Sequence, residues 1–157
     1  MKKILIMLFI ASLGVISCKK ESCENPFYCD WDTPFEVPPF DKIKIEHFKP
    51  AFLKGMEEEM AEVNAIISNT DAPTFDNTLR AMQFTGKLMT KVQRAWGPLS
   101  GANTNDSIQA LQREMSPLFS RHSDDIALNE KLFERVKSVY ENREKFNLTP
   151  EESKLLE

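Results

Sequence analysis

Histidine is scarce in this sequence, which rules out an H-E-x-x-H zinc site. Among 157 residues there are only His47 and His122, and neither has a second histidine four positions away. His47 lies where the first expected helix begins, so we expect it to cap that helix or to pack. His122 precedes Ser123-Asp124-Asp125, but consecutive residues of one helix point to different faces and do not form a catalytic triad. We therefore predict no catalytic and no metal-binding residue in this chain.

Glycine and cysteine are also few. The five glycines are scattered, so no glycine-rich phosphate-binding loop is present. The three cysteines are Cys18, Cys23 and Cys29, and without nearby histidines they cannot build a zinc finger. In an oxidising compartment Cys23 and Cys29 could form a disulfide across a small loop, or they could remain free thiols. Spacing alone does not decide between the two.

The chain opens with "MKKILIMLFIASLGVISCKK", which has the charge layout of a secretory signal. Lys2 and Lys3 precede an apolar stretch that is short for a membrane-spanning helix. The following Val15-Ile16-Ser17-Cys18 resembles the lipobox of bacterial lipoproteins, in which the cysteine thiol takes a diacylglyceryl group. An ordinary signal with a chance cysteine is the alternative. We expect residues 1–17 to be a lipoprotein signal peptide and Cys18 to be the lipidation site.

An acylated Cys18 would anchor the protein to a lipid bilayer, because two or three acyl chains on one residue bind a membrane stably. We expect the cell envelope, at the outer membrane or the periplasmic face. Loss of residues 1–17 removes Lys2 and Lys3 and changes the formal net charge from −4 to −6. This negative charge argues against a nucleic-acid partner and against a polybasic membrane patch.

Residues 18–32 are interpreted as a polar tether and residues 33–48 as an extended arm. The arm includes Pro34, Pro38 and Pro39, which lack backbone donors and restrict the backbone to extended or turning conformations. It is also rich in phenylalanine and isoleucine, although such a segment cannot form a core of its own. We therefore expect the arm to lie against another body.

We predict that the remainder of the chain, residues 49–157, is all-α. Apolar residues at helical spacing and polar caps indicate four antiparallel-type helices and the start of a fifth. The expected ranges are 49–68, 74–96, 106–127, 130–145 and a segment that begins at Pro150. In the first of these, Pro50 would occupy the first turn. In the second, Gly97-Pro98 would kink or end the helix, and in the third, Pro117 would produce a kink.

Two features suggest that these helices belong to a larger body. The apolar positions of the second helix cover roughly 220° of its circumference at ~100° per residue, far more than one core-facing stripe. The fifth helix has a cap at Thr149 and a capping-box partner at Glu152, yet the sequence reaches Glu157 without a C-cap. Leu155 and Leu156 are left to pack against something else.

Several separate segments resemble one protein family, in the same order along the chain. They are "TPFEVPPFDKIKIEHFKPAFLKGMEEEMAEVNAI", "APTFDNTL", "GANTND", "SPLFSRHSDDIALNEKLFERVKSVYE" and "LTPEESKLLE". Together they resemble the amino-terminal part of bacterial peptidyl-dipeptidases, which belong to the thimet-oligopeptidase-like family of zinc metallopeptidases. The similarity runs from about Asn25 to Glu157.

The resemblance implies a large helical peptidase with a deep channel that admits short oligopeptide substrates, from whose C-termini dipeptides are removed. The family's zinc is held by an H-E-x-x-H helix and a later glutamate, all in a catalytic part for which this chain has no matching residues. We therefore expect this chain to contribute one channel wall, to bind no zinc and to be inactive alone. It could be a gene fragment, a truncated chain or one half of a split protein.

Two other functions remain open at this stage. The chain could be a free-standing, lipid-anchored helical lipoprotein that binds peptides or a partner without catalysis. It could also be a degraded remnant without function. About 140 residues after the signal peptide are enough for one hydrophobic core, so length does not separate these hypotheses.

Overall fold

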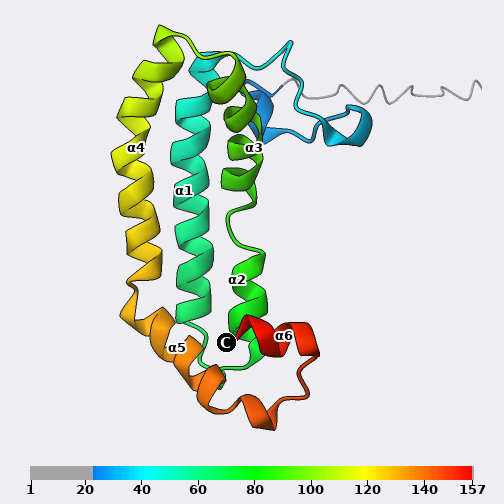
Figure 1. Cartoon of the computed structure of the whole chain (residues 1–157), viewed down its shortest axis with the longest axis vertical. Helices are drawn as coiled ribbons and strands as arrows, with labels where there is room; N and C mark the ends of the chain where they lie inside the picture. The colour runs from blue at the N-terminus through cyan, green and yellow to red at the C-terminus, as the bar shows by residue number, and fades with distance from the viewer. Residues whose placement is uncertain (1–22, 157) are drawn as a thin grey trace, which may run out of the picture.

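The computed structural model describes residues 23–156, and over this range the fold is all-α, as predicted (Figure 1). The predicted signal peptide 1–17 and Cys18 lie outside the described residues. The α-helices are α1 (Ile45–Ile67), α2 (Ala81–Gln83), α3 (Lys87–Ala102), α4 (Asp106–Ala127), α5 (Glu130–Glu141) and α6 (Pro150–Leu155). None of these helices is long and apolar enough to cross a membrane.

The long helix α1 is the centre of the fold and packs against α3 on one side and α4 on the other (Figure 1). It begins four residues earlier than expected, at Ile45, because the Nδ1 atom of His47 accepts a hydrogen bond of 3.0 Å from the backbone N–H of Lys44. His47 is therefore a capping residue. Pro50 lies inside the helix and not in its first turn, so α1 forgoes only the bond to the carbonyl of Glu46.

The prediction of one helix over 74–96 is wrong. The segment forms a π-helical stretch (Phe75–Arg80), then the short α2, and the backbone breaks at Gly86 before α3 begins. Gly86 has a φ of 68°, which a residue with a side chain rarely adopts, and its N–H donates to Glu62 Oε2 over 2.8 Å. A Cβ atom at this position would lie 2.5 Å from Glu59 Oε1, so the Glu59 side chain would have to move, and the positive φ would remain strained.

Gly97-Pro98 does not end the next helix, because α3 runs through Pro98 to Ala102. Pro98 removes only one helical hydrogen bond, and its side chain is exposed. The side chains that hold α3 in place are Met89, Val92 and Ala95, all of which are buried. Packing of this face therefore outweighs the local preference of Gly97-Pro98 for a helix end.

The later helices agree better with their predicted ranges. Helix α4 has the predicted bounds, and the Asn105 side chain caps it by accepting from the Ile108 N–H at 3.0 Å. Helix α5 ends at Glu141, earlier than predicted, and a 3-10 turn (Arg143–Lys145) follows it. Helix α6 has the predicted capping box between Thr149 and Glu152.

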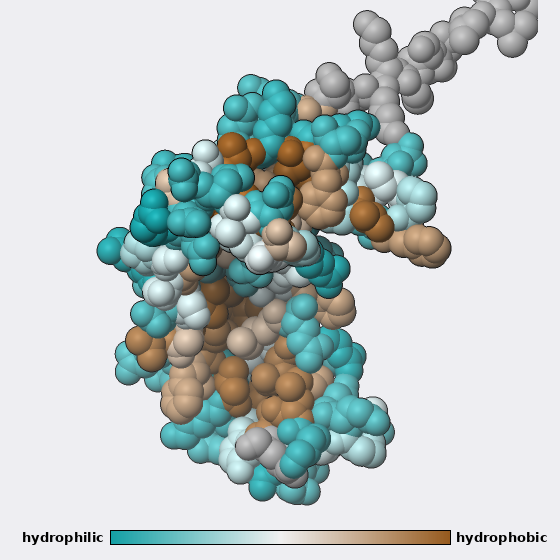
Figure 2. Space-filling view, turned by 45° about the horizontal axis from the view of Figure 1, so that its top comes forward, coloured by the Kyte–Doolittle hydropathy of each residue, from teal (hydrophilic) through white to brown (hydrophobic). Residues whose placement is uncertain are grey.

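Two hydrophobic clusters hold these elements together. The larger one is rich in aromatic rings and joins α1, α3 and α4; Phe52 is at its centre, in edge-to-face contact with Trp96 and Phe119. The smaller one consists of the buried residues Val63, Ile66 and Leu132, where α5 meets the end of α1. Figure 2 shows hydrophobic atoms open to view on the lower half of the molecule, where the elements around this smaller cluster lie.

Of the predicted tether 18–32 the structure describes only the part from Cys23 on, and this part and the arm 33–48 are more ordered than a tether and an extended arm. From Asn25 to Trp31 the supposed tether packs onto the helices, because the apolar ring of Phe27 is fully buried in the larger cluster. The arm is not extended throughout: it contains a 3-10 turn (Pro34–Glu36), and its last residues, from Ile45, already belong to α1. Between these points the arm projects away from the helices (Figure 1).

Candidate functional site

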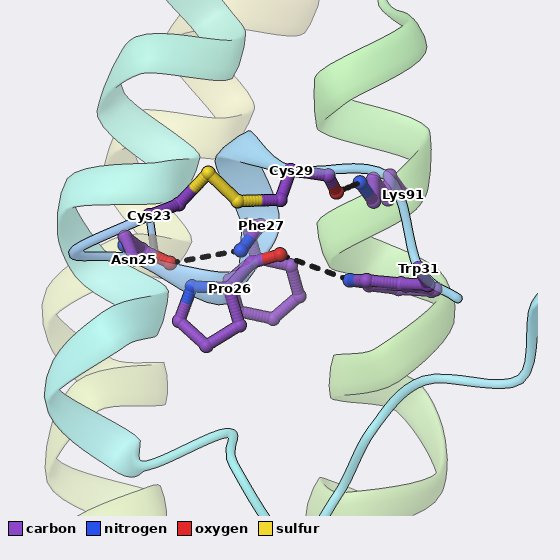
Figure 3. The surroundings of a disulfide bond; sticks show 7 residues. All are labelled: Cys23, Asn25, Pro26, Phe27, Cys29, Trp31 and Lys91. Carbon is purple, nitrogen blue, oxygen red and sulfur yellow. Dashed lines mark hydrogen bonds between the residues drawn. A yellow bond between two sulfur atoms is a disulfide. The ribbon is translucent and has the colours of Figure 1, made fainter. Parts of the chain in front are cut away.

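The residues around Cys23 and Cys29 form a closed loop that lies over the larger cluster (Figure 3). The two cysteines are joined by a disulfide, with their Cα atoms 6.1 Å apart. Inside the loop, the Asn25 side chain accepts from the Phe27 N–H at 3.0 Å and donates to the His47 carbonyl at 2.8 Å. The loop is therefore tied to the start of α1 by a polar contact and to the core by the Phe27 ring.

Trp31 and Lys91 extend this loop toward α3. The indole Nε1 of Trp31 donates to the Pro26 carbonyl over 2.9 Å, which fixes the plane of the ring. The Lys91 ammonium lies 4.6 Å from the centre of that ring and donates a hydrogen bond to the Cys29 carbonyl (Figure 3). Burial lowers the pKa of Lys91, and the negative charges of Asp30 and Glu36 oppose that shift.

A groove of about 790 Å³ lies between this loop, the arm and the helix break around Gly86. Its basic residues are Lys87, Lys91 and Arg94 from α3, and its acidic residues are Asp30 and Glu36 from the other wall. Trp31, Phe35 and Phe84 are its aromatic residues. The groove combines apolar rings with charges of both signs, as ligand-binding pockets commonly do.

The backbone at the tip of the arm is strained. Phe35 and Glu36 have φ values of 57° and 54°, in the left-handed region that costs a residue with a Cβ roughly 1–2 kcal/mol. The Thr33 hydroxyl donates to the Val37 carbonyl across this turn at 2.6 Å. The Phe35 side chain is fully exposed and lines the groove.

The second histidine belongs to a polar pair between α1 and α4. His122 Nε2 lies 2.8 Å from Glu59 Oε2, and both side chains are mostly shielded from solvent. Ser123 and Asp124 are exposed on the helix, and the imidazole of His122 is paired with Glu59, so the structure brings together no Ser-His-Asp triad there. The pair lies beside the Gly86 break, and its geometry is that of a helix-packing contact.

Comparison with known proteins defines the relationship of the chain. It is 38% identical over 133 residues to a dipeptidyl carboxypeptidase of Escherichia coli, and 35% identical over 133 residues to the dipeptidyl carboxypeptidase of Salmonella typhimurium. The chain is a relative of the bacterial dipeptidyl carboxypeptidases. The resemblance to peptidyl-dipeptidases is thus confirmed over 85% of the chain. The chain spans 20% of the length of these two dipeptidyl carboxypeptidases.

A more distant similarity reaches a second type of peptidase. The chain is 22% identical over 107 residues to oligopeptidase A of Escherichia coli, which covers 68% of the chain and 16% of that relative. No family model matches the chain. The similarity to the dipeptidyl carboxypeptidases is therefore both stronger and longer than the similarity to oligopeptidase A.

The family to which the chain is similar consists of zinc metallopeptidases, so the fit of the described residues to a zinc ion is relevant. Between residues 23 and 156, no group of three or more His, Cys, Asp or Glu side chains is arranged to hold a metal. His122 is paired with Glu59, and His47 caps α1. The two sulfurs of Cys23 and Cys29 are bonded to each other. The described residues therefore do not fit the zinc site of the family.

Sequence reasoning missed the groove itself. It named Cys23 and Cys29 but gave no role to Trp31, Lys91 or the helix break that forms one end of the groove. The signal for the break was Gly86 within a strongly helical pattern, which often marks a backbone conformation that only glycine adopts. Cys18, the predicted lipidation site, lies outside the described residues.

Proposed function

We propose that this chain forms the amino-terminal, non-catalytic channel wall of a zinc peptidyl-dipeptidase that removes dipeptides from the C-termini of oligopeptides. The proposal rests on the 38% identity to a dipeptidyl carboxypeptidase. The chain spans only 20% of the length of that relative. Substrates and zinc would then be bound chiefly by the remainder of the longer protein. The chain would limit which peptides gain access.

The distribution of exposed apolar side chains supports this proposal. Phe35 and Val37 on the arm are exposed, as are Phe133 on α5 and Leu155 on α6. These residues occupy opposite ends of the molecule, so no single small ligand would cover them. A large helical body that contacts both ends would bury this surface, at a gain of roughly 25 cal/mol per Å² of apolar area.

We further propose that Cys18 carries the lipid anchor and that the protein works in the cell envelope. The charge layout of residues 1–17 and the lipobox-like sequence before Cys18 support this. The Cys23–Cys29 disulfide is also in keeping with an oxidising compartment. Replacement of Cys18 by serine should abolish incorporation of a clickable fatty acid, and labelling that persists in Cys18→Ser would refute the anchor.

The coding sequence downstream of Glu157 gives the cheapest test of the peptidase proposal. An H-E-x-x-H run in frame, or after one frameshift, supports it, whereas a stop followed by an unrelated gene contradicts it. The biochemical test is an assay of the full chain with zinc and a blocked oligopeptide. We expect no release of dipeptides from the chain alone, and release once the downstream part is joined to it.

One observation favours the alternative, a lipid-anchored binding lipoprotein without catalysis. The larger hydrophobic cluster is well formed, with Phe52, Val92 and Met115 fully buried, and a groove lies beside it. Under this alternative the chain unfolds cooperatively as a stable monomer. Under the peptidase proposal it is loosely packed around the smaller cluster and binds a hydrophobic dye.

A further inference from the structure

The floor of the groove carries a row of cations along one face of α3. Lys87, Lys91 and Arg94 follow one another at four and three residues, which places them about 6 Å and 4.5 Å apart along the helix axis. Within residues 23–156, neither Lys87 nor Arg94 has a carboxylate within ion-pairing distance. Two of the three cations are therefore available to an anionic ligand.

The third cation, Lys91, is held in a fixed position. It lies against the Trp31 ring and donates to the Cys29 carbonyl, whose position is set by the disulfide loop (Figure 3). A lysine held in this way loses little side-chain freedom when it binds a ligand. The row thus has one ordered ammonium group between two exposed cationic side chains.

Exposed aromatic rings border the same groove. Phe35 is 100% exposed and Phe84 is 61% exposed, on the arm and at the helix break respectively. The left-handed backbone at Phe35 presents its ring to solvent at a cost in free energy, and nothing among the described residues packs on it. Strained backbone and exposed large apolar groups both concentrate at binding sites.

The opposite wall determines where an anion can bind. Asp30 and Glu36 come from the loop and the arm, so negative charge of a ligand is favoured along α3 and disfavoured along the arm. The aromatic rings border both walls. A ligand with carboxylates on one edge and an apolar group on the other would match this pattern.

We propose that this groove binds an extended peptide segment that carries acidic residues at alternate positions next to an aromatic residue. Alternate residues of an extended peptide are about 6.7 Å apart and share one edge, close to the axial spacing of Lys87 and Lys91. The span of α3 from Lys87 to Arg94 is about 10 Å, the length of three extended residues. This function goes beyond the channel-wall proposal, because it requires neither zinc nor the remainder of a peptidase.

The test uses the full chain and two fluorescein-labelled peptides, Phe-Glu-Ala-Glu-Ala and its glutamine counterpart Phe-Gln-Ala-Gln-Ala, in anisotropy titrations. We expect saturable binding of the glutamate peptide that weakens as salt is raised, and much weaker binding of the glutamine peptide. The double variant Lys87→Gln/Arg94→Gln should bind the glutamate peptide about tenfold less tightly. Glu36→Gln, on the opposite wall, should bind it about twofold more tightly.

The matched control is Lys131→Gln/Arg113→Gln, which removes the same two charges from exposed positions on α5 and α4, away from the groove. It should leave the affinity unchanged, and circular dichroism should show the same fold for all variants. Equal binding of the two peptides, equal loss in both double variants, or no saturable binding would overturn the proposal. The last result would favour an apolar occupant, such as a segment of a longer peptidase.

Discussion

The two ends of this molecule are packed very differently. Around the start of α1, aromatic rings from the disulfide loop, α1, α3 and α4 fill the larger cluster, and Phe27, Phe48 and Phe52 are almost completely buried. Around the end of α1, the smaller cluster has few buried members, and large side chains such as Phe133 and Leu128 remain exposed nearby. The first end therefore has the better-packed core, although its arm exposes Phe35, and the second end has only a small core beside exposed apolar side chains.

A buried charge marks the second end as well. The Arg135 guanidinium is buried and donates from Nη1 to the Asn69 carbonyl at 2.7 Å and from Nη2 to Asn77 Oδ1 at 3.2 Å. These bonds hold the connection that follows α1 against α5. The first end is held mainly by ring packing, whereas the second combines a small hydrophobic cluster with hydrogen bonds from one buried cation.

The largest effect is expected from a truncation inside the larger cluster. Phe52→Ala should lower the free energy of unfolding by about 4 kcal/mol, because it removes a ring in contact with Trp96 and Phe119 and leaves a cavity. Leu132→Ala, in the smaller cluster, should cost about 2 kcal/mol, since its surroundings are less tightly packed and can relax. Urea unfolding monitored by circular dichroism measures both. Equal losses would show that the two ends are equally well packed.

Gly86→Ala should cost about 2 to 3 kcal/mol, because alanine is strained at a φ of 68° and its Cβ would displace Glu59 from its position near His122. Gly101→Ala is the control on the same helix. A Cβ at Gly101 meets nothing within 4 Å, so this change should raise stability slightly through helix propensity. If both substitutions had the same effect, the break before α3 would not depend on glycine.

Removal of the disulfide by Cys23→Ser/Cys29→Ser should cost about 2 kcal/mol, the loop-closure value for a loop this short. The loss should appear first at the disulfide loop and the start of α1, because Phe27 is inserted there. Amide hydrogen exchange can show which residues lose protection. Faster exchange around α5 and α6, at the other end, would contradict the separation of the two regions.

The smallest effect concerns pH and the second end. The hydrogen bond from the Thr149 N–H, together with Arg80, holds the pKa of Glu152 below its usual value. Because the folded pKa is lowered, the contribution of Glu152 is present above the ordinary pKa of glutamate and is lost as pH falls through the lowered value. We expect α6 to fray in that acidic window, seen as exchange broadening of the Thr149 amide signal in NMR spectra. Glu152→Gln should remove this pH dependence, and a signal unchanged by acid would refute it.

The elements that could be predicted are those whose signals are local. Asn105, Asn129 and Thr149 are side chains that cap the residues immediately after them, so the starts of α4, α5 and α6 were predicted correctly. The starts of α1 and α3 were predicted wrongly because they depend on less local features. A histidine three residues on completes the cap of α1, and the break before α3 is set by contact between Gly86 and the carboxylates of α1.

The candidate groove could not have been predicted at all, because its parts are distant in the chain. Trp31, Phe84 and Lys91 come from a loop, a helix break and a helix. The sequence shows that these residues are aromatic or charged, but it does not show that they lie close together. Which of them face one another depends on where Phe27 is buried, and that is a property of the packed core.

By itself, the sequence determined that the chain is all-α, that it is related to peptidyl-dipeptidases and that it carries no H-E-x-x-H helix, because residue spacing, caps and matching segments are properties of the chain in order. Only the tertiary structure decided that the cysteine loop belongs to the core, that the second helix breaks at Gly86 and that three cations of α3 line one groove with aromatic residues of other segments. The physical reason is that burial and close approach are settled between segments far apart in the chain, and they can outweigh the local preferences that a sequence displays.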